Sequence, residues 1–262
     1  MLSDYPVHAV LASTDVDRAR AWYSERLGLE PLRERDGQLL YGIGASVFTI
    51  YRTTFAGTAK NTVAVWGVDD LRAEVVRLRA RGLVFEELDF GPDDRTVDGV
   101  MTTRLGSEIV LNAWFRDADG NWISVVQQPP EPGDQLGISP MIAAADIARA
   151  RAWYADRLGL QPYHDYGEEV TYRPGLSHLS IYATPSAGTA KNTVAEWHVP
   201  DLRTTMADLR ARGLEFEEYD FGTMKTVDGV MRDPEDGSLN AWFTDSEGNV
   251  HGIVEGDTRT AF

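Results

Sequence analysis

Two stretches of the chain place histidine next to acidic or hydroxyl side chains at a spacing that suits proton transfer. Glu196 and His198 stand two residues apart in a strand-like run, and His178, Ser180 and Tyr182 keep the same spacing in another. Side chains two residues apart on a β-strand point to the same face of the sheet. Because a histidine close to a carboxylate is a candidate general base near neutral pH, these runs predict a polar group for acid–base chemistry, provided that the fold brings them into one cup.

The composition excludes several other kinds of chemistry. The 262-residue chain contains no cysteine, which rules out disulfides, thiolate metal sites, iron–sulfur clusters and a cysteine nucleophile. It has no phosphate-binding glycine loop, no dinucleotide fingerprint and no Ser-His-Asp signature. With 25 Lys and Arg against 41 Asp and Glu, the net charge is −16. This charge disfavours nucleic acids and anionic membranes as partners, since both attract basic surfaces.

The N-terminal segment and the apolar runs predict the cellular compartment. Residues 1–10 lack a basic stretch before an apolar core, so they do not resemble a signal peptide. No apolar run approaches the ~18 residues of a membrane-spanning helix. We expect a cytoplasmic protein.

The chain consists of two similar halves. Several distinctive segments occur twice in the same order, which indicates a duplication. They are RARAWY (18–23 and 149–154), AGTAKNTVA (56–64 and 187–195), LRARGL (78–83 and 209–214) and TVDGVM (96–101 and 226–231). The segment between the halves contains a Pro-Pro and a Pro-Gly pair, which is typical of an exposed linker. We predict one domain over residues 1–128, a linker over 129–135 and a second domain over 136–256.

Each half divides again into two units with the same pattern of elements. A unit begins with a strand, continues with a helix that an Asp can cap and a Gly can end, and finishes with about three more strands. In the first half we expect strands at 7–12, 46–52, 63–68, 110–115 and 122–127, and helices from Thr14 or Asp15 to Gly28 and over 71–82. The pattern predicts an α+β protein of four βαβββ units.

Four such units in two tandem pairs resemble the vicinal oxygen chelate superfamily, which includes glyoxalase I, extradiol dioxygenases, fosfomycin-resistance proteins and bleomycin-binding proteins. The resemblance covers nearly the whole chain. It is carried by HAVLASTDVDRARAWYSERLGLEPL (8–32), VAVWGVDDLRAEVVRLRARGL (63–83) and AWFRDADGNWISVVQ (113–127), and by their copies at 141–162, 194–214 and 241–255. The resemblance implies two tandem domains whose curved, cup-shaped mixed sheets enclose a small ligand, and it leaves the chemistry open.

The resemblance also provides a test for the metal centre that enzymes of this superfamily build from His and Glu on the concave face. Of the ligand positions that it implies, His8 carries a metal-binding side chain, seven residues before the capping Asp15. The other positions hold Thr49, Val63, Ser124, Ser139, Ser180, Val194 and Gly252. One histidine cannot supply the roughly three or four donors that a divalent ion needs. We therefore expect no metal cofactor, with a divalent ion involving His8 as the alternative.

Two classes of function remain open. The first is a metal-free binding protein, similar to the bleomycin-resistance members, that encloses a small hydrophobic or aromatic molecule in an aromatic-rich cup. We expect its ligand-binding residues on the concave face and at the mouth, where Trp side chains can stack on a flat ligand. They are His8, Thr49, Tyr51, Trp114, Ser124, Ser139, Ser180 and Trp242.

The second class is an enzyme. It would be a metal-independent isomerase or lyase with Glu196, His198, His178 and Tyr182 as catalytic residues, or a glyoxalase-like or dioxygenase-like metalloenzyme. The same polar residues could instead line a rim or an interface between the halves, or form an unusual metal site. A monomer that acts as a pseudo-dimer and a homodimer both fit the duplication. Whether each cup lies within one half or is formed by units exchanged between halves is open.

Overall fold

The computed structural model describes residues 1–35, 37–91, 95–105, 108–127, 137–220, 222, 225–234 and 237–256. The predicted linker, 129–135, lies outside these residues. The four units appear in the predicted order, and the α+β fold class is confirmed. Within the described ranges, no helix is both long enough and apolar enough to cross a membrane.

The first half contains units 1 and 2. Unit 1 consists of β1 (Val7–Ser13), α1 (Val16–Trp22), β2 (Arg33–Arg35), β3 (Gln38–Ile43) and β4 (Ser46–Arg52). Unit 2 consists of β5 (Thr62–Gly67), α2 (Leu71–Ala80), β6 (Thr96–Val97), β7 (Val100–Leu105), β8 (Glu108–Arg116) and β9 (Trp122–Gln127). A 3-10 turn, Leu2–Asp4, precedes β1.

The second half contains units 3 and 4. Unit 3 consists of β10 (Ile138–Ala144), α3 (Ile147–Trp153), β11 (His164–Asp165), β12 (Glu169–Tyr172) and β13 (Leu179–Ala183). Unit 4 consists of β14 (Thr193–Val199), α4 (Leu202–Ala211), β15 (Met231–Arg232), β16 (Leu239–Thr244) and β17 (Val250–Glu255).

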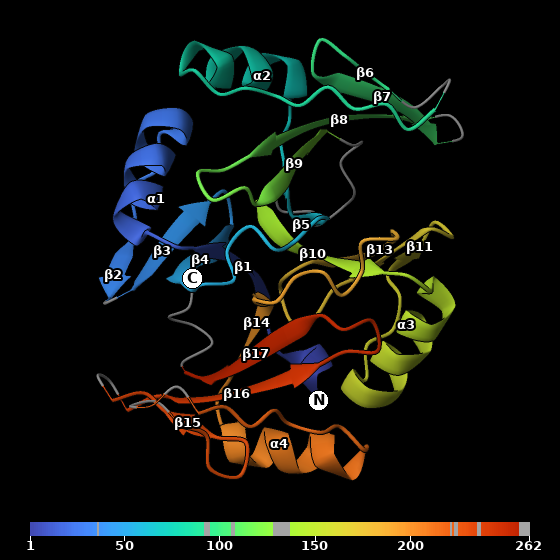
Figure 1. Cartoon of the computed structure of the whole chain (residues 1–262). Coiled ribbons are helices and arrows are strands. Elements are labelled where there is room, and N and C mark those ends of the chain that lie inside the picture. Colours follow the sequence, from blue (N-terminus) through green and yellow to red (C-terminus); the bar gives the residue numbers. More distant parts are fainter. Residues whose placement is uncertain are drawn as a thin grey trace.

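Each sheet is assembled from both halves of the chain. One sheet has the order β15-β16-β17-β14-β1-β4-β3-β2 and joins unit 4 to unit 1. The other has the order β11-β12-β13-β10-β5-β9-β8-β7-β6 and joins unit 3 to unit 2. Both sheets are curled half-barrels, and the four helices lie on the outside of the molecule (Figure 1). We name the sheets by the units that they join, the 1/4 sheet and the 2/3 sheet. The concave side of the 1/4 sheet is the first cup, and that of the 2/3 sheet is the second cup.

The helix boundaries follow from the capping residues that the sequence indicated. The Asp15 carboxylate accepts hydrogen bonds from the backbone N–H groups of Asp17 and Arg18, so it caps the start of α1. A short π-helical turn, Tyr23–Leu27, extends the helix to Gly28, whose φ of 74° is the left-handed conformation that favours glycine. The helix packs through Tyr23, which is buried and stacks on Tyr41.

The crossover segments that connect the paired units contact each other reciprocally. The Lys60 N–H donates to the Thr189 hydroxyl, and the Lys191 N–H donates to the Thr58 hydroxyl, both over 3.1 Å. The strands β1 and β10 pack beside each other where the two sheets meet. These paired contacts are those of a pseudo-twofold axis between the halves, as the duplication predicted.

The strand order answers the question that the sequence left open. The first strand of unit 1, β1, pairs in antiparallel fashion with β14 of unit 4, and β10 of unit 3 pairs in the same way with β5 of unit 2. Each cup is therefore formed by units exchanged between the halves. Residues far apart in the sequence become neighbours in this way, and this pairing creates the site described below.

Candidate functional site

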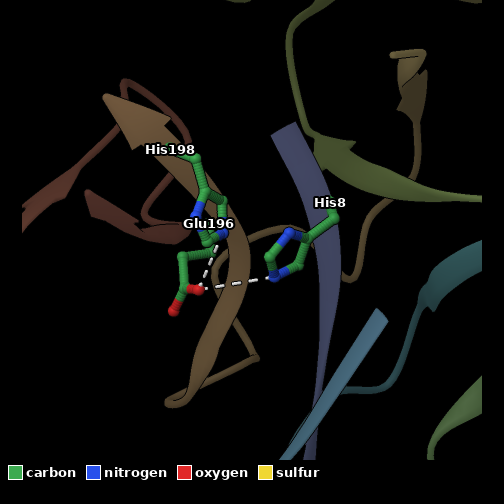
Figure 2. Close-up of side chains that lie close together, drawn as sticks. All are labelled: His8, Glu196 and His198. Carbon is green, nitrogen blue, oxygen red and sulfur yellow. Dashed lines mark ion pairs between the residues drawn. The ribbon is translucent and has the colours of Figure 1, made fainter. Parts of the chain in front are cut away.

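Three side chains with metal-binding or proton-transferring groups meet on the floor of the first cup. In the antiparallel pairing of β1 with β14, His8 lies directly opposite Glu196, and His198 follows two residues later on the same face. Nε2 of His8 lies 3.3 Å from Oε1 of Glu196, and Nε2 of His198 lies 3.2 Å from the same oxygen. Figure 2 shows both imidazoles directed at this oxygen, with the second carboxylate oxygen turned away from them. We call these three residues the His/Glu group.

The three side chains of the His/Glu group differ in burial, and their burial and mutual contacts set their charges. The exposed fraction of the side chain is 3% for His8, 14% for His198 and 23% for Glu196. Burial, together with the nearby His198, lowers the pKa of the His8 imidazole. Partial burial would raise the pKa of the Glu196 carboxyl, but its contacts with His198 and His8 outweigh this effect and lower the pKa well below the usual range. At neutral pH the group therefore holds an uncharged His8 and an ionised Glu196.

Thr49 on the neighbouring strand β4 holds the His8 ring in place. Its hydroxyl lies 3.2 Å from Nε2 of His8, and the Thr49 side chain is buried. The imidazoles of His8 and His198 also pack together, with ring centroids 4.5 Å apart. The orientation of His8 is thus fixed by contacts from both units of the first cup.

The separations within the His/Glu group match those of donors that share one ion. Donors bound to a divalent ion at about 2.0–2.2 Å, at tetrahedral or octahedral angles, lie about 2.8–3.6 Å from each other. A direct charge-assisted N–H···O hydrogen bond is shorter, at about 2.7–2.9 Å. The one ligand atom that each residue offers lies within 4.8 Å of the others, as a common metal ion requires.

The charge states of the group support the same interpretation. Metal binding also requires neutral imidazole and ionised carboxylate, which are the states of His8 and Glu196. Two imidazoles and one carboxylate therefore fit a divalent ion such as Zn²⁺ or Fe²⁺.

A pocket of about 280 Å³ opens above the His/Glu group. Most of the residues that line it are of polar type, whereas we expected an apolar, aromatic-rich cup. Unit 1 contributes His8, Arg33, Arg35, Gln38, Leu40 and Thr49, and unit 4 contributes Glu196, His198, Asp233, Ser238, Asn240, Val254, Glu255 and Gly256. The aliphatic side chains in this lining are Leu40 and Val254, and neither Trp114 nor Trp242 belongs to it.

Two tyrosines from the predicted site, Tyr51 as a ligand-binding residue and Tyr182 as a catalytic residue, hydrogen-bond to the backbone. The Tyr51 hydroxyl accepts a hydrogen bond of 3.0 Å from the Thr193 N–H, and the Tyr182 hydroxyl accepts one of 2.9 Å from the Thr62 N–H. Burial raises the pKa of both phenols. Each tyrosine therefore ties one unit to the start of its partner unit's first strand.

The predicted convergence of the two polar runs does not occur. Glu196 and His198 lie in the first cup, whereas Ser180 and Tyr182 are on β13 and His178 directly precedes it in the 2/3 sheet. The cause is the exchange of units, since β14 pairs with β1 and not with β10. Ser180 belongs to the second cup, where its hydroxyl hydrogen-bonds to the carboxyl of Glu169, and burial raises the pKa of this carboxyl.

The remaining predicted residues also divide between the cups. Ser139 lies opposite Val65 in the 2/3 sheet, and the buried Ser124 pairs with both Val65 and Trp114. Trp114 packs edge-to-face against Phe90. In the 1/4 sheet, Trp242 packs edge-to-face against Tyr219.

Several pocket residues were missed from the sequence. Arg33, Arg35 and Gln38 enter the first cup from β2 and β3, and Asn240 enters from β16. The two arginines alternate in RER, which places them on one face of a strand, and this signal could have identified them. The partnership of His8 with Glu196 had no sequence signal, since it depends on the exchange.

Comparison with known proteins identifies the family. Residues 6–125 match the model described as the Glyoxalase/Bleomycin resistance protein/Dioxygenase superfamily. The second half repeats the units of the first in sequence and in topology. Residues 6–125 therefore form a domain of this superfamily, as the resemblance indicated.

A solved structure of similar fold covers nearly the whole chain. Glyoxalase I from Zea mays is similar with a TM-score of 0.65 and 16% sequence identity, covering 97% of this chain and 92% of that chain. Lactoylglutathione lyase from Agrobacterium tumefaciens, at 19% identity and a TM-score of 0.35, covers 47% of this chain and 93% of its own. None of the curated proteins matches the chain in sequence.

Proposed function

We propose that the first cup is the active site of a metal-dependent lyase or isomerase that acts on a small polar molecule. The observation that carries this proposal is the convergence of His8, Glu196 and His198 at donor–donor distances of 3.2–3.3 Å at the base of a polar pocket. The alternative that we drew from the sequence, a metalloenzyme involving His8, thereby gains two further donors. The hypothesis of a metal-free binding protein rested mainly on the lack of metal donors beside His8, and this reason no longer applies.

The residues of the first cup have separate roles in this proposal. A divalent ion would be held by Nε2 of His8, in place of the contact with the Thr49 hydroxyl, by Nε2 of His198 and by Oε1 of Glu196. A bound divalent ion supplies Lewis-acid polarisation of a substrate oxygen. Glu196 is the most exposed member of the His/Glu group, and its second oxygen is turned away from the imidazoles. This oxygen is placed to accept a proton from a molecule in the pocket and to return it, as lyase and isomerase reactions require.

The pocket also bears on the size and polarity of the substrate. Pockets for drug-sized ligands measure about 300–1,000 Å³ and are lined mostly by apolar side chains, whereas this one measures about 280 Å³ and most of its lining residues are of polar type. Enclosure of a small hydrophobic or aromatic molecule, the first hypothesis from the sequence, has less support than binding of a small polar substrate.

One observation favours a second candidate function. A donor set of two histidines and one carboxylate with open positions is also the arrangement of non-haem Fe(II) oxygenases. The His/Glu group has this composition. A dioxygenase-like reaction is therefore the second candidate, and the identity of the bound metal separates it from the first.

The test is elemental analysis of the chain purified without added metal or chelator, followed by titration of the metal-free protein with Zn²⁺. We expect one divalent ion per chain, which the His198→Ala variant does not retain. Zinc or another redox-inactive ion favours the lyase or isomerase, and iron favours the oxygenase. Failure of wild-type protein to bind any divalent ion at stoichiometric concentration would refute both.

A further inference from the structure

We propose that the substrate of the first cup is a small carboxylate whose anionic group is held by the guanidinium of Arg33. Its other end then faces the His/Glu group. This inference rests on the proposed function for the identity of the reacting end. The anion-binding end stands on separate observations, which concern the register, the charge and the size of the pocket.

The register of the sheet links Arg33 to the His/Glu group in one continuous row. Arg33 on β2 lies opposite Leu40 on β3, and Leu40 lies opposite Thr49 on β4. Residues directly opposite each other share one face of a sheet, and all three line the pocket. Since the Thr49 hydroxyl contacts Nε2 of His8, this row leads from the edge of the sheet to the proposed metal ligands.

The length of this row limits the size of the ligand. Two strand spacings of about 4.8 Å separate the backbones of Arg33 and Thr49 by about 10 Å, and the long side chain of Arg33 takes up part of this distance. A molecule of only a few carbon atoms can therefore contact the guanidinium at one end and the His/Glu group at the other. The pocket volume of about 280 Å³ agrees with a ligand of this size.

The charges along the pocket orient the ligand. The chain has a net charge of −16, yet Arg33 and Arg35 both lie on the wall that unit 1 contributes. The opposite wall, from unit 4, carries the carboxylates of Glu196, Asp233 and Glu255 beside Asn240. An anionic group is attracted to the first wall and repelled by the carboxylates on the second. Guanidinium binds a carboxylate through two parallel hydrogen bonds, which makes this anion a better match than a neutral group of the same shape.

The second cup shows that this basic wall is not a requirement of the fold. The stretch LGLEPLRER at 27–35 corresponds to LGLQPYHDY at 158–166. At the positions of Arg33 and Arg35, the second cup therefore has His164 and Tyr166. The guanidinium groups occur in the cup that contains the His/Glu group, and this association is expected if both serve one substrate.

The test compares two probes of equal shape. The carboxylate 4-hydroxybutyrate and its neutral isostere 4-hydroxybutyramide carry a hydroxyl at the far end; both are titrated by calorimetry into wild-type protein loaded with Zn²⁺. We expect 4-hydroxybutyrate to bind at least about tenfold more tightly than 4-hydroxybutyramide, since a charge-assisted hydrogen bond is stronger than a neutral one. In the Arg33→Gln variant this preference should disappear while Zn²⁺ binding is unchanged.

Matched variants separate the local effect from general electrostatics. Arg203→Gln removes the same charge from the exposed surface of α4 and should retain the preference. Arg33→Lys keeps the positive charge but lacks the planar guanidinium with its paired donors, so it should retain only part of the preference for the carboxylate probe. Equal affinity of wild-type protein for the two probes, no binding of 4-hydroxybutyrate to zinc-loaded protein, or an undiminished preference in Arg33→Gln would overturn the inference. Loss of the preference in Arg33→Gln in a protein that binds no Zn²⁺ would refute the proposed function and leave the anion site standing.

Discussion

The two cups share one backbone arrangement and differ in the side chains at matching positions. The pairing of His8 with Glu196 in the first cup has its counterpart in the pairing of Ser139 with Val65 in the second. The position of His198 corresponds to Gly67. The last strands of units 1 and 3, β4 and β13, end in the same way, since Tyr51 and Tyr182 accept equivalent backbone hydrogen bonds.

This difference teaches that the fold supplies positions and not chemistry. Three substitutions separate a convergent donor set from a surface without metal-binding side chains at the same places. The second cup still carries polar groups, among them Glu169, which contacts Ser180. Glu169 on β12 and Ser180 on β13 belong to unit 3, and neither lies on the central strands β10 and β5.

The largest effect is expected when the first cup receives a residue of the second. Glu196→Val removes the only carboxylate of the His/Glu group, and we expect Zn²⁺ affinity to fall at least about 100-fold, beyond the 10–100-fold loss typical of changes outside the donor set. Calorimetric titration of the metal-free protein measures this. Ser139→Ala in the second cup is the control and should change nothing. A Glu196→Val protein that keeps wild-type affinity would show that the ion binds elsewhere.

The reverse transfer tests whether the register of the strands is sufficient. The triple variant Ser139→His, Val65→Glu and Gly67→His recreates the His/Glu group on the paired strands of the second cup. We expect a second equivalent of Zn²⁺ to bind, at least about tenfold more weakly than the first, because Thr49 is replaced there by Ser180 and orienting contacts contribute to affinity. The metal content per chain decides. An unchanged content would mean that features beyond the register select the ion.

A pH-dependent difference is expected between the two buried aspartates of the final turns. Burial alone would raise the pKa of the Asp245 carboxyl, but the contacts with His251 and Asn249 outweigh it and lower this pKa. At Asp117, burial outweighs the hydrogen bonds and raises the pKa of the carboxyl. The residue matching His251 in the first half is Ile123. His251→Ile should therefore raise the pKa of Asp245 in the folded state.

The sign of the resulting stability change follows from linkage. A carboxyl with a lowered folded-state pKa stabilises the fold above its unfolded pKa of about 3.9 and loses this contribution as the pH falls. His251→Ile should cost about 2 kcal/mol of unfolding free energy at pH 7. The cost should shrink toward pH 4, as the raised pKa lets the buried Asp245 become protonated. Urea unfolding at both pH values measures the change, with Ile123→Val as control; an equal cost at both would contradict this account.

The smallest effect is expected from the tyrosines that the two cups share. Tyr51→Phe and Tyr182→Phe each leave one backbone N–H without its acceptor, so each should cost about 1–2 kcal/mol of unfolding free energy. Zn²⁺ binding should be unchanged in both. Urea unfolding and metal titration check the two statements. A Tyr182→Phe protein with normal stability and no catalytic activity would support the prediction that Tyr182 is a catalytic residue.

The fold was predictable because its signals are local. Asp15 and Gly28 mark the ends of a helix through backbone geometry that depends on a few neighbouring residues. The alternation of side chains along strands correctly placed Glu196 and His198 on one face.

The site was only partly predictable because it depends on which strands pair. Two arrangements of the same four units satisfy the same local patterns, and they bring different partners to His8. Counting donors within the ligand pattern of the family left His8 isolated, whereas the antiparallel pairing of β1 with β14 supplies Glu196 and His198 from unit 4. Long-range pairing of this kind leaves no periodicity in the sequence.

The exchange of units has a consequence for how such a chain can evolve. If each half were a separate polypeptide, two identical copies would build two identical cups, and every change in one would appear in the other. Covalent fusion breaks this constraint, because each sheet now draws on two distinct stretches of one gene. One cavity can then acquire donors and a basic wall while its sibling drifts, and the ancestral symmetry survives only in the backbone.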